Sequence, residues 1–119
     1  MSYSEKIQEI IDGSDVALFM KGTPSMVMCG NSDRALNALR RAGAPITAVD
    51  ILPDAQIRQD LSAISGWPTI PQVFVRGELV GGADIVEELE QSGELEQTLT
   101  DKLGEDYAES RDEKTVSLV

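Results

Sequence analysis

Apolar residues recur along this chain of 119 residues with two different periods, and each period predicts one kind of element. In five segments the apolar side chains fall three or four positions apart, which is typical of amphipathic helices. Short runs such as Val16–Met20 are apolar throughout, which indicates strands buried on both faces of a sheet. The expected helices lie near residues 3–12, at 30–42, between Asp54 and Gly66, after Asp84 and around 95–103, and the expected strands lie at 16–20, 46–50, 72–75 and 79–80.

The order of these elements predicts the fold class. A strand, a helix and a second strand in succession favour a parallel pair, whereas the strands on either side of residues 76–78 favour an antiparallel hairpin. We therefore expect an α/β domain with a four-stranded mixed sheet flanked by helices. Ligands of such sheets gather beyond the carboxyl ends of the parallel strands, so a site is expected in the segment after residue 20.

Negative charge is concentrated at the carboxyl end of the chain. The formal net charge is −11, and residues 84–119 alone carry 12 acidic and 3 basic side chains. Residues 104–119 are mostly polar without a sustained apolar period, so we expect a domain at 1–103 followed by an acidic, flexible tail at 104–119. A chain this acidic is not expected to bind nucleic acid or an anionic membrane surface.

The expected location follows from three features that the sequence lacks. No apolar run approaches the roughly 20 residues of a membrane span. The first residues have neither the basic start nor the apolar stretch of a signal peptide. A single cysteine excludes an internal disulfide framework. We therefore expect a reducing, cytoplasmic setting.

Cys29 is the residue that most directly indicates chemistry. It stands between a turn rich in glycine and proline and the start of a predicted amphipathic helix. A thiol at a helix N-terminus faces unpaired N–H groups and the positive end of the helix dipole, and both favour the thiolate. The thiolate is the form that attacks disulfides and binds soft metals. Because Cys29 is alone, redox or metal chemistry requires a second thiol from outside the chain.

Four motifs in order resemble those of the monothiol glutaredoxins, over about residues 5–103. They are Phe19-Met20-Lys21-Gly22-Thr23-Pro24, Cys29-Gly30-Asn31-Ser32, Trp67-Pro68-Thr69-Ile70-Pro71-Gln72-Val73 and Gly81-Gly82-Ala83-Asp84. The resemblance implies a thioredoxin-like fold, in agreement with the order of elements. It also implies that glutathione binds and that two protomers hold a [2Fe-2S] cluster between them, with one cysteine from each protomer and two glutathiones. Such a cluster is held by four ligands, normally thiolates, which agrees with one cysteine per chain.

The same resemblance implies a role for individual residues. Cys29 would be the reacting thiol and the protein ligand of the cluster. The backbone of Ile70, before a cis peptide bond to Pro71, would pair with the cysteinyl part of glutathione. The residues implied at the two ends of glutathione are Lys21 and Arg58 for the glycyl carboxylate, and Ala83 and Asp84 for the γ-glutamyl group.

Structural interpretations of these residues remain open, and one residue departs from the family. Lys21 and Arg58 could be ordinary surface charges, and Asp84 could serve only as a helix cap. Trp67 could pack in the core or form a platform at the edge of the site. Asn31 stands where the family has phenylalanine in Cys-Gly-Phe-Ser, so a small polar side chain replaces a large apolar one that would shield a cluster.

Three functions are compatible with these residues and with the resemblance. The resemblance implies the first, a glutathione-dependent carrier that binds a [2Fe-2S] cluster, as a homodimer bridged by the cluster or with a BolA-like protein as partner, and passes it to apo iron–sulfur proteins. The second is a monothiol glutathione-dependent disulfide oxidoreductase that removes glutathione from mixed disulfides, and family resemblance implies at most weak enzyme activity. The third is a scaffold that keeps the fold without the chemistry.

Overall fold

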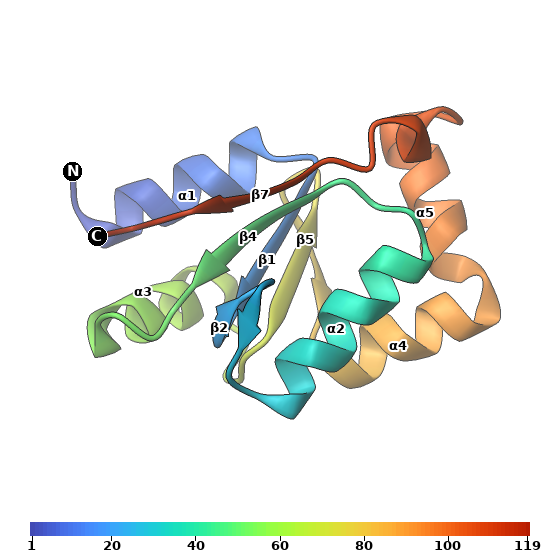
Figure 1. Ribbon diagram of the computed structural model, residues 1–119. Coiled ribbons are helices and arrows are strands. Elements are labelled where there is room, and N and C mark those ends of the chain that lie inside the picture. Colours follow the sequence, from blue (N-terminus) through green and yellow to red (C-terminus); the bar gives the residue numbers. More distant parts are fainter.

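A computed structural model describes residues 1–119 and places a five-stranded sheet between two layers of helices (Figure 1). The strands of this sheet are ordered β6-β5-β1-β4-β7, and β2 and β3 form a separate two-stranded sheet. The strands are β1 (Val16–Met20), β2 (Gly22–Thr23), β3 (Met26–Val27), β4 (Ile46–Asp50), β5 (Gln72–Val75), β6 (Glu78–Gly81) and β7 (Glu113–Val116). The helices are α1 (Tyr3–Gly13), α2 (Gly30–Arg41), α3 (Ala55–Ser65), α4 (Ala83–Ser92), α5 (Glu94–Leu103) and the short 3-10 helix η1 (Tyr107–Glu109).

The mixed sheet is built as the order of elements predicts. β1 runs parallel to β4, with Ala17 opposite Thr47, and antiparallel to β5. β5 and β6 form a hairpin across Arg76 and Gly77, whose φ angles are 49° and 83°. Two central residues with positive φ are typical of the tight turns whose twist matches that of the flanking strands. The parallel pair and the antiparallel hairpin are therefore both confirmed.

Each face of the sheet is covered by its own pair of helices (Figure 1). α1 and α3 contact each other on one face, and α2 and α4 contact each other on the opposite face. Successive side chains of a strand point to opposite faces, so Phe19 joins the apolar cluster under α1 and α3, while Leu18 and Met20 join the cluster under α2 and α4. β1 is therefore buried on both sides. None of the helices has both the length and the apolar character needed to cross a membrane.

The segment between β1 and α2, expected as a loop, contains a small hairpin. β2 pairs with β3 antiparallel, and the N–H of Met26 donates to the hydroxyl of Thr23 (3.2 Å). Gly22 begins the hairpin with a φ of 92°, and a Cβ at this position would collide with the backbone carbonyl oxygen of Met26. Glycine is the residue that this backbone accepts. The hairpin brings the chain from the end of β1 to Cys29.

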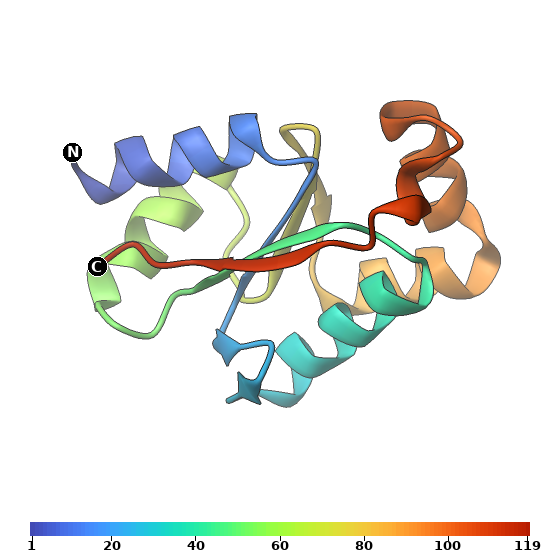
Figure 2. The same cartoon turned by 45° about the horizontal axis from the view of Figure 1, so that its top comes forward.

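The C-terminal segment differs from the expectation of a four-stranded sheet followed by a flexible tail. β7 lies along the edge of β4 and pairs with it in parallel, which makes the sheet five-stranded (Figure 2). Beyond β7, Leu118 is only 3% exposed, and Lys6 Nζ donates to its carbonyl oxygen (3.1 Å). The hydroxyl of Tyr107 in η1 donates to the carbonyl oxygen of Ala42 (2.7 Å). Residues 104–119 are thus tied to the domain at both ends of the segment.

The sequence pattern does not reveal β7 because β7 is an edge strand. Three of its four residues, 113–115, are exposed, so no apolar alternation marks them. The strand is positioned by backbone pairing, by an ion pair between Arg40 Nη2 and Glu113 Oε1 (2.8 Å), and by the burial of Leu118. The predictions of four strands and of a tail without regular structure are therefore wrong.

Candidate functional site

Cys29 lies immediately before the first residue of α2, directly after the β2–β3 hairpin. Its side chain is half-buried, and α2 begins without a side-chain cap. The pKa of the Cys29 thiol is lowered, first by the backbone N–H of Ser32, and further by the backbone N–H of Asn31, the charge of Lys21 and the Ser32 hydroxyl, against the opposing effect of burial. The site therefore favours the thiolate, which is the reactive form of cysteine.

Ser32 connects the helix that carries Cys29 to the end of β1. Its side chain is fully buried, and its hydroxyl oxygen accepts a hydrogen bond from the backbone N–H of Lys21 (3.0 Å). The N–H of Met28 donates to the carbonyl oxygen of Lys21 (3.0 Å), which closes the segment between them. These two hydrogen bonds fix the end of β1 and the hairpin relative to the start of α2. The serine of the Cys-Gly-Asn-Ser motif therefore has a structural role.

Asp50 is a second anchor of this region, and the motifs in the sequence do not single it out. One carboxylate oxygen, Oδ1, accepts from the backbone N–H of Gly22 (2.9 Å) and from that of Leu52 (2.9 Å). A carboxylate at the carboxyl end of a buried strand is the signal that could have identified it. Asp50 holds the start of the β2–β3 hairpin at the carboxyl end of β4.

The loop before β5 has the cis Ile70–Pro71 peptide bond that the family resemblance implies. Gln72 is fully buried, and its Nε2 donates to the carbonyl oxygens of Trp67 (2.9 Å) and Thr69 (3.2 Å), which holds the loop in shape. The backbone N–H and C=O of Ile70 make no hydrogen bond within the chain. Ile70 therefore offers one backbone donor and one acceptor to a ligand. For Gln72, a polar residue at the start of an apolar strand is the signal in the sequence that could have identified it.

A cavity of about 370 Å³ brings together three of the predicted site residues: Ile70, Ala83 and Asp84. Trp67 also lines this cavity and therefore lies at the edge of the site. α4 begins at one wall of the cavity without a side-chain cap, which leaves its first N–H groups unpaired. Such a helix start attracts a carboxylate. Cys29 lines a neighbouring hollow at the start of α2.

The two predicted cations lie differently with respect to the thiol. Lys21 is half-buried, forms no ion pair, and is near enough to Cys29 to lower its pKa. Arg58 is an exposed residue of α3 that forms no ion pair and lines neither the cavity nor the hollow beside it. Lys21 also lines neither the cavity nor the hollow. Its charge acts on the thiol, but the roles of Lys21 and Arg58 in binding glutathione both stay predictions.

Arg34 is a charged residue at the site that sequence reasoning missed. Its guanidinium donates to Asp84 Oδ1 (2.9 Å), Glu87 Oε1 (2.8 Å) and Asn31 Oδ1 (3.2 Å), so it connects the starts of α2 and α4. Arg34 lowers the pKa of the Glu87 carboxyl, chiefly through their hydrogen bond. These carboxylate partners are about 50 residues away in the chain, so local sequence contains no signal for this contact.

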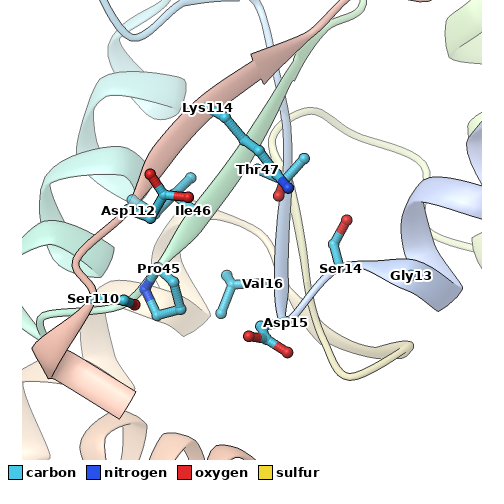
Figure 3. Close-up of a pocket in the computed structure, with 10 residues that line it drawn as sticks. All are labelled: Gly13, Ser14, Asp15, Val16, Pro45, Ile46, Thr47, Ser110, Asp112 and Lys114. Atoms are coloured by element: carbon cyan, nitrogen blue, oxygen red, sulfur yellow. The ribbon is translucent and has the colours of Figure 1, made fainter. Parts of the chain in front are cut away.

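A second cavity, of about 200 Å³, lies at the opposite end of the sheet (Figure 3). It is lined by residues that precede or begin β1, β4 and β7, among them Asp15, Thr47 and Lys114. Cys29 follows the other end of β1, and none of the predicted site residues lines this cavity. The candidate chemistry therefore belongs to the carboxyl ends of the parallel strands, as the fold class predicts.

Comparisons with known proteins agree with this geometry. The family model described as glutaredoxin matches residues 16–80. The chain is 51% identical over 84 residues to the Legionella pneumophila protein named "Probable monothiol glutaredoxin GrlA", and the match covers 71% of this chain and 94% of that protein. This chain belongs to the monothiol glutaredoxin family. The chain is also 47% identical over 94 residues to an uncharacterized monothiol glutaredoxin of Synechocystis, with 79% of this chain and 88% of that protein covered.

Some relatives of this glutaredoxin are much longer than the chain. It is 48% identical over 100 residues to monothiol glutaredoxin-S11 of rice, Oryza sativa. That match covers 84% of this chain and only 20% of the rice protein. The chain thus spans about a fifth of that relative, which contains regions with no counterpart in the matched part.

Solved structures show the same thioredoxin-like fold. Reduced poplar apo GrxS14 gives a TM-score of 0.76 at 35% identity, over 86% of this chain and 94% of that one. The holo form of glutaredoxin C1 from Populus tremula x tremuloides gives 0.73 at 31% identity, over 84% and 88% of the two chains. A buckwheat glutaredoxin–glutathione complex gives 0.72 at 25% identity, over 83% and 88%. The predicted fold is therefore confirmed.

Proposed function

We propose that this monothiol glutaredoxin binds glutathione beside Cys29 and, as a dimer, carries a [2Fe-2S] cluster that it passes to apo iron–sulfur proteins. The observation that carries the proposal is a thiol with a lowered pKa next to a cavity lined by unpaired backbone groups. Ile70 contributes an N–H and a C=O, and the start of α4 contributes further N–H groups. Such a combination suits an anionic peptide thiol better than a substrate without a backbone.

Glutathione has the chemistry that these groups match. It is a tripeptide with a central thiol, a glycyl carboxylate at one end, and a carboxylate and an ammonium at the γ-glutamyl end. Ile70 would pair with its cysteinyl backbone, Lys21 would attract the glycyl carboxylate, and Asp84 would accept from the ammonium. The uncapped start of α4 at Ala83 would receive the γ-glutamyl carboxylate. The similarity to a glutaredoxin–glutathione complex supports this arrangement.

The cluster is cargo in this proposal, and the number of thiols determines how it would be held. A [2Fe-2S] cluster takes four thiolates, and each chain supplies only Cys29. Two chains and two glutathiones complete the set. The surface around the thiol is open for a second protomer, or for a BolA-like protein in its place, because Met26 and Met28 are 70% and 62% exposed. Cys29, oriented by Ser32, is the residue that would hold the cluster.

A second function, glutathione-dependent thiol–disulfide exchange, is favoured by two observations. The pKa of Cys29 is lowered, and Asn31 is an exposed polar residue where a large apolar one would cover a cluster. In this reaction the Cys29 thiolate attacks the glutathione sulfur of a mixed disulfide, and the other thiol leaves. A second glutathione thiolate then attacks the new bond, releases glutathione disulfide and restores Cys29.

Anaerobic reconstitution with iron, sulfide and glutathione separates the two functions. We expect the visible absorption of a bound cluster together with the mass of a dimer in size-exclusion chromatography. Both should require glutathione, and both should disappear in Cys29→Ser. A colourless monomer that still forms a mixed disulfide at Cys29 would contradict cluster binding and leave thiol exchange as the function. A coloured Cys29→Ser protein would contradict the role of Cys29 as the ligand of the cluster.

We also propose a reducing compartment, the cytoplasm, as the setting for this chemistry. Thiols remain reduced there, and glutathione supplies the thiol that this single-cysteine chain lacks. In an oxidising compartment Cys29 would persist as a mixed disulfide. Trapping the thiols of growing cells with an alkylating reagent tests this proposal, and a fully oxidised Cys29 would contradict it.

A further inference from the structure

Arg34 forms a polar bridge at the edge of the cavity that the proposed function assigns to glutathione. Its Nε and Nη2 bind the carboxylate of Glu87 (3.3 and 2.8 Å), and Nη2 also donates to Asp84 Oδ1 (2.9 Å). Its Nη1 donates to the amide oxygen of Asn31 (3.2 Å). Asn31 and Asp84 both line the cavity, so the bridge joins two of its walls.

Three polar groups of this bridge remain unpaired. A guanidinium has five N–H donors, and the contacts with Glu87, Asp84 and Asn31 use four of them, which leaves one N–H on Nη1. The amide nitrogen of Asn31 and the second carboxylate oxygen of Asp84, Oδ2, also have no partner in the chain. The side chain of Arg34 is 40% exposed. The bridge thus leaves free two donor groups, on Arg34 and Asn31, and one anionic acceptor, on Asp84.

This pattern is complementary to an α-amino acid group. The γ-glutamyl end of glutathione carries a carboxylate and an ammonium on the same carbon. The two donors suit the carboxylate, together with the unpaired N–H groups at the start of α4. The acceptor of Asp84 suits the ammonium. A thiol whose cysteinyl nitrogen carries a simple acyl group in place of the γ-glutamyl group offers neither a carboxylate nor an ammonium at this end.

We propose that Arg34 is a specificity-determining residue that selects thiols with a γ-glutamyl end, by receiving the carboxylate of that end while Asp84 receives the ammonium. The bidentate contact with Glu87 holds the guanidinium in place, so Arg34 has little freedom to lose when the ligand binds. The proposal rests on the glutathione site proposed above. It gives the γ-glutamyl end a cation of its own, distinct from Lys21 and Arg58 at the glycyl end.

The test compares two disulfides as reagents for Cys29: glutathione disulfide, and the disulfide of N-acetylcysteinylglycine, which keeps the cysteinyl amide and the glycyl carboxylate but lacks the α-amino acid group of the γ-glutamyl residue. In each reaction the Cys29 thiolate attacks one sulfur, the S–S bond breaks, and one thiolate leaves and takes a proton. Mass spectrometry of acid-quenched samples gives the two second-order rate constants. Their ratio is the preference for the γ-glutamyl group.

We expect the wild type to prefer glutathione disulfide and Arg34→Met to lose about fivefold or more of that preference, because a charge-assisted hydrogen bond to the ligand is lost. Arg34→Lys keeps the charge without the planar fork and should retain part of the preference. Arg34→Met is also compared with the wild type by thermal unfolding, so that a folding defect is seen separately. An unchanged ratio in a folded Arg34→Met protein would overturn the proposal.

Arg41→Met is the matched control. Arg41 Nε binds Glu90 Oε1 (2.7 Å), so it joins α2 to α4 as Arg34 does, at the other end of both helices. Arg41→Met should keep the wild-type ratio, and a loss equal to that of Arg34→Met would overturn the proposal by attributing the effect to helix packing. A wild type without any preference would instead contradict the proposed glutathione site, so the two failures are distinguishable.

Discussion

The two pairs of helices that cover the sheet begin in different ways. On one face, the hydroxyl of Ser2 caps α1 and the carboxylate of Asp54 caps α3. On the other face, α2 begins after Cys29 and α4 after Gly82, and neither start has a side-chain cap. Both uncapped starts lie at the candidate site, and both capped starts belong to the pair of helices on the opposite face.

This difference in capping indicates that the two pairs of helices have different roles. A side-chain cap contributes about 0.5–2 kcal/mol to stability, so α2 and α4 forgo a stabilising contact that α1 and α3 have. The N–H groups at these two helix starts are in return available to the reacting groups of the site. At α2 that group is the thiol of Cys29 itself, whose pKa is lowered by the N–H groups of Ser32 and Asn31. At α4 we propose that it is a carboxylate of glutathione.

The largest effect is expected when α2 is given the cap that it lacks. Cys29→Asp places a capping carboxylate on a residue whose backbone, with φ −154° and ψ 134°, already has the extended geometry of a cap. Reaction with glutathione disulfide should vanish, while the free energy of unfolding should rise by about 0.5–2 kcal/mol. Urea unfolding measures the second effect. A destabilised Cys29→Asp protein would contradict the view that α2 gives up stability for chemistry.

Ser32→Ala should have the next largest effect, because it disturbs both the fold and the thiol. The backbone N–H of Lys21 would lose the acceptor that it has inside the protein, which costs about 1–3 kcal/mol. The pKa of Cys29 should rise, since the Ser32 hydroxyl helps to lower it. Urea unfolding and ultraviolet absorbance of the thiolate measure the two effects. Ser92→Ala, at an exposed position, is the control and should leave the thiol pKa unchanged.

Removal of a cap from the opposite pair should affect stability alone. Asp54→Ala deletes the carboxylate that accepts from the N–H of Gln56 (2.9 Å), and the expected loss is about 1 kcal/mol. The rate of glutathionylation of Cys29 should match that of the wild type, because Asp54 caps α3, which lies on the other face. A large change in this rate would contradict the view that caps on α1 and α3 contribute to stability without affecting the thiol.

The smallest effect is expected from the ion pair that joins the uncapped helices. Arg34 lowers the pKa of Glu87 below its ordinary value of 4.5. A carboxyl with a lowered folded pKa adds stability above its unfolded pKa, and that stability is lost as the pH falls through the folded pKa. Arg34→Met should therefore be slightly less stable than the wild type at neutral pH and equal to it in acid. A difference that grows in acid would contradict this pairing.

Much of the fold and of the site could be predicted from the sequence because local patterns encode them. The continuous apolar run at 16–20 predicts the central strand, and the order and spacing of the four motifs indicate the family. Ile70, Ala83 and Asp84 do line one cavity. These features depend on residues that are close in sequence, or on the spacing of the four motifs. That spacing is known from the family and indicates which distant residues meet in the fold.

The features that the sequence did not reveal depend on contacts between distant segments. β7 is an exposed edge strand, and pairing with β4 rather than an apolar pattern positions it. In the sequence, Arg34 looks like any other charged residue of an amphipathic helix. Only the fold places Asp84 and Glu87 of α4 beside it. Asp50 and Gln72 had local signals, a carboxylate at the end of a buried strand and an amide at the start of one, but their partners are backbone groups that only the folded chain brings beside them.

The central claim is that the start of α2 lowers the pKa of Cys29 and so favours the thiolate for glutathione chemistry. The most direct test is the rate at which Cys29 of the wild type reacts with glutathione disulfide, measured across the pH range. The account predicts a rate that rises with pH and levels off, with a midpoint below the value of 9.0 for an ordinary thiol. A midpoint at or above 9.0, or a thiol that does not react at all, would contradict it.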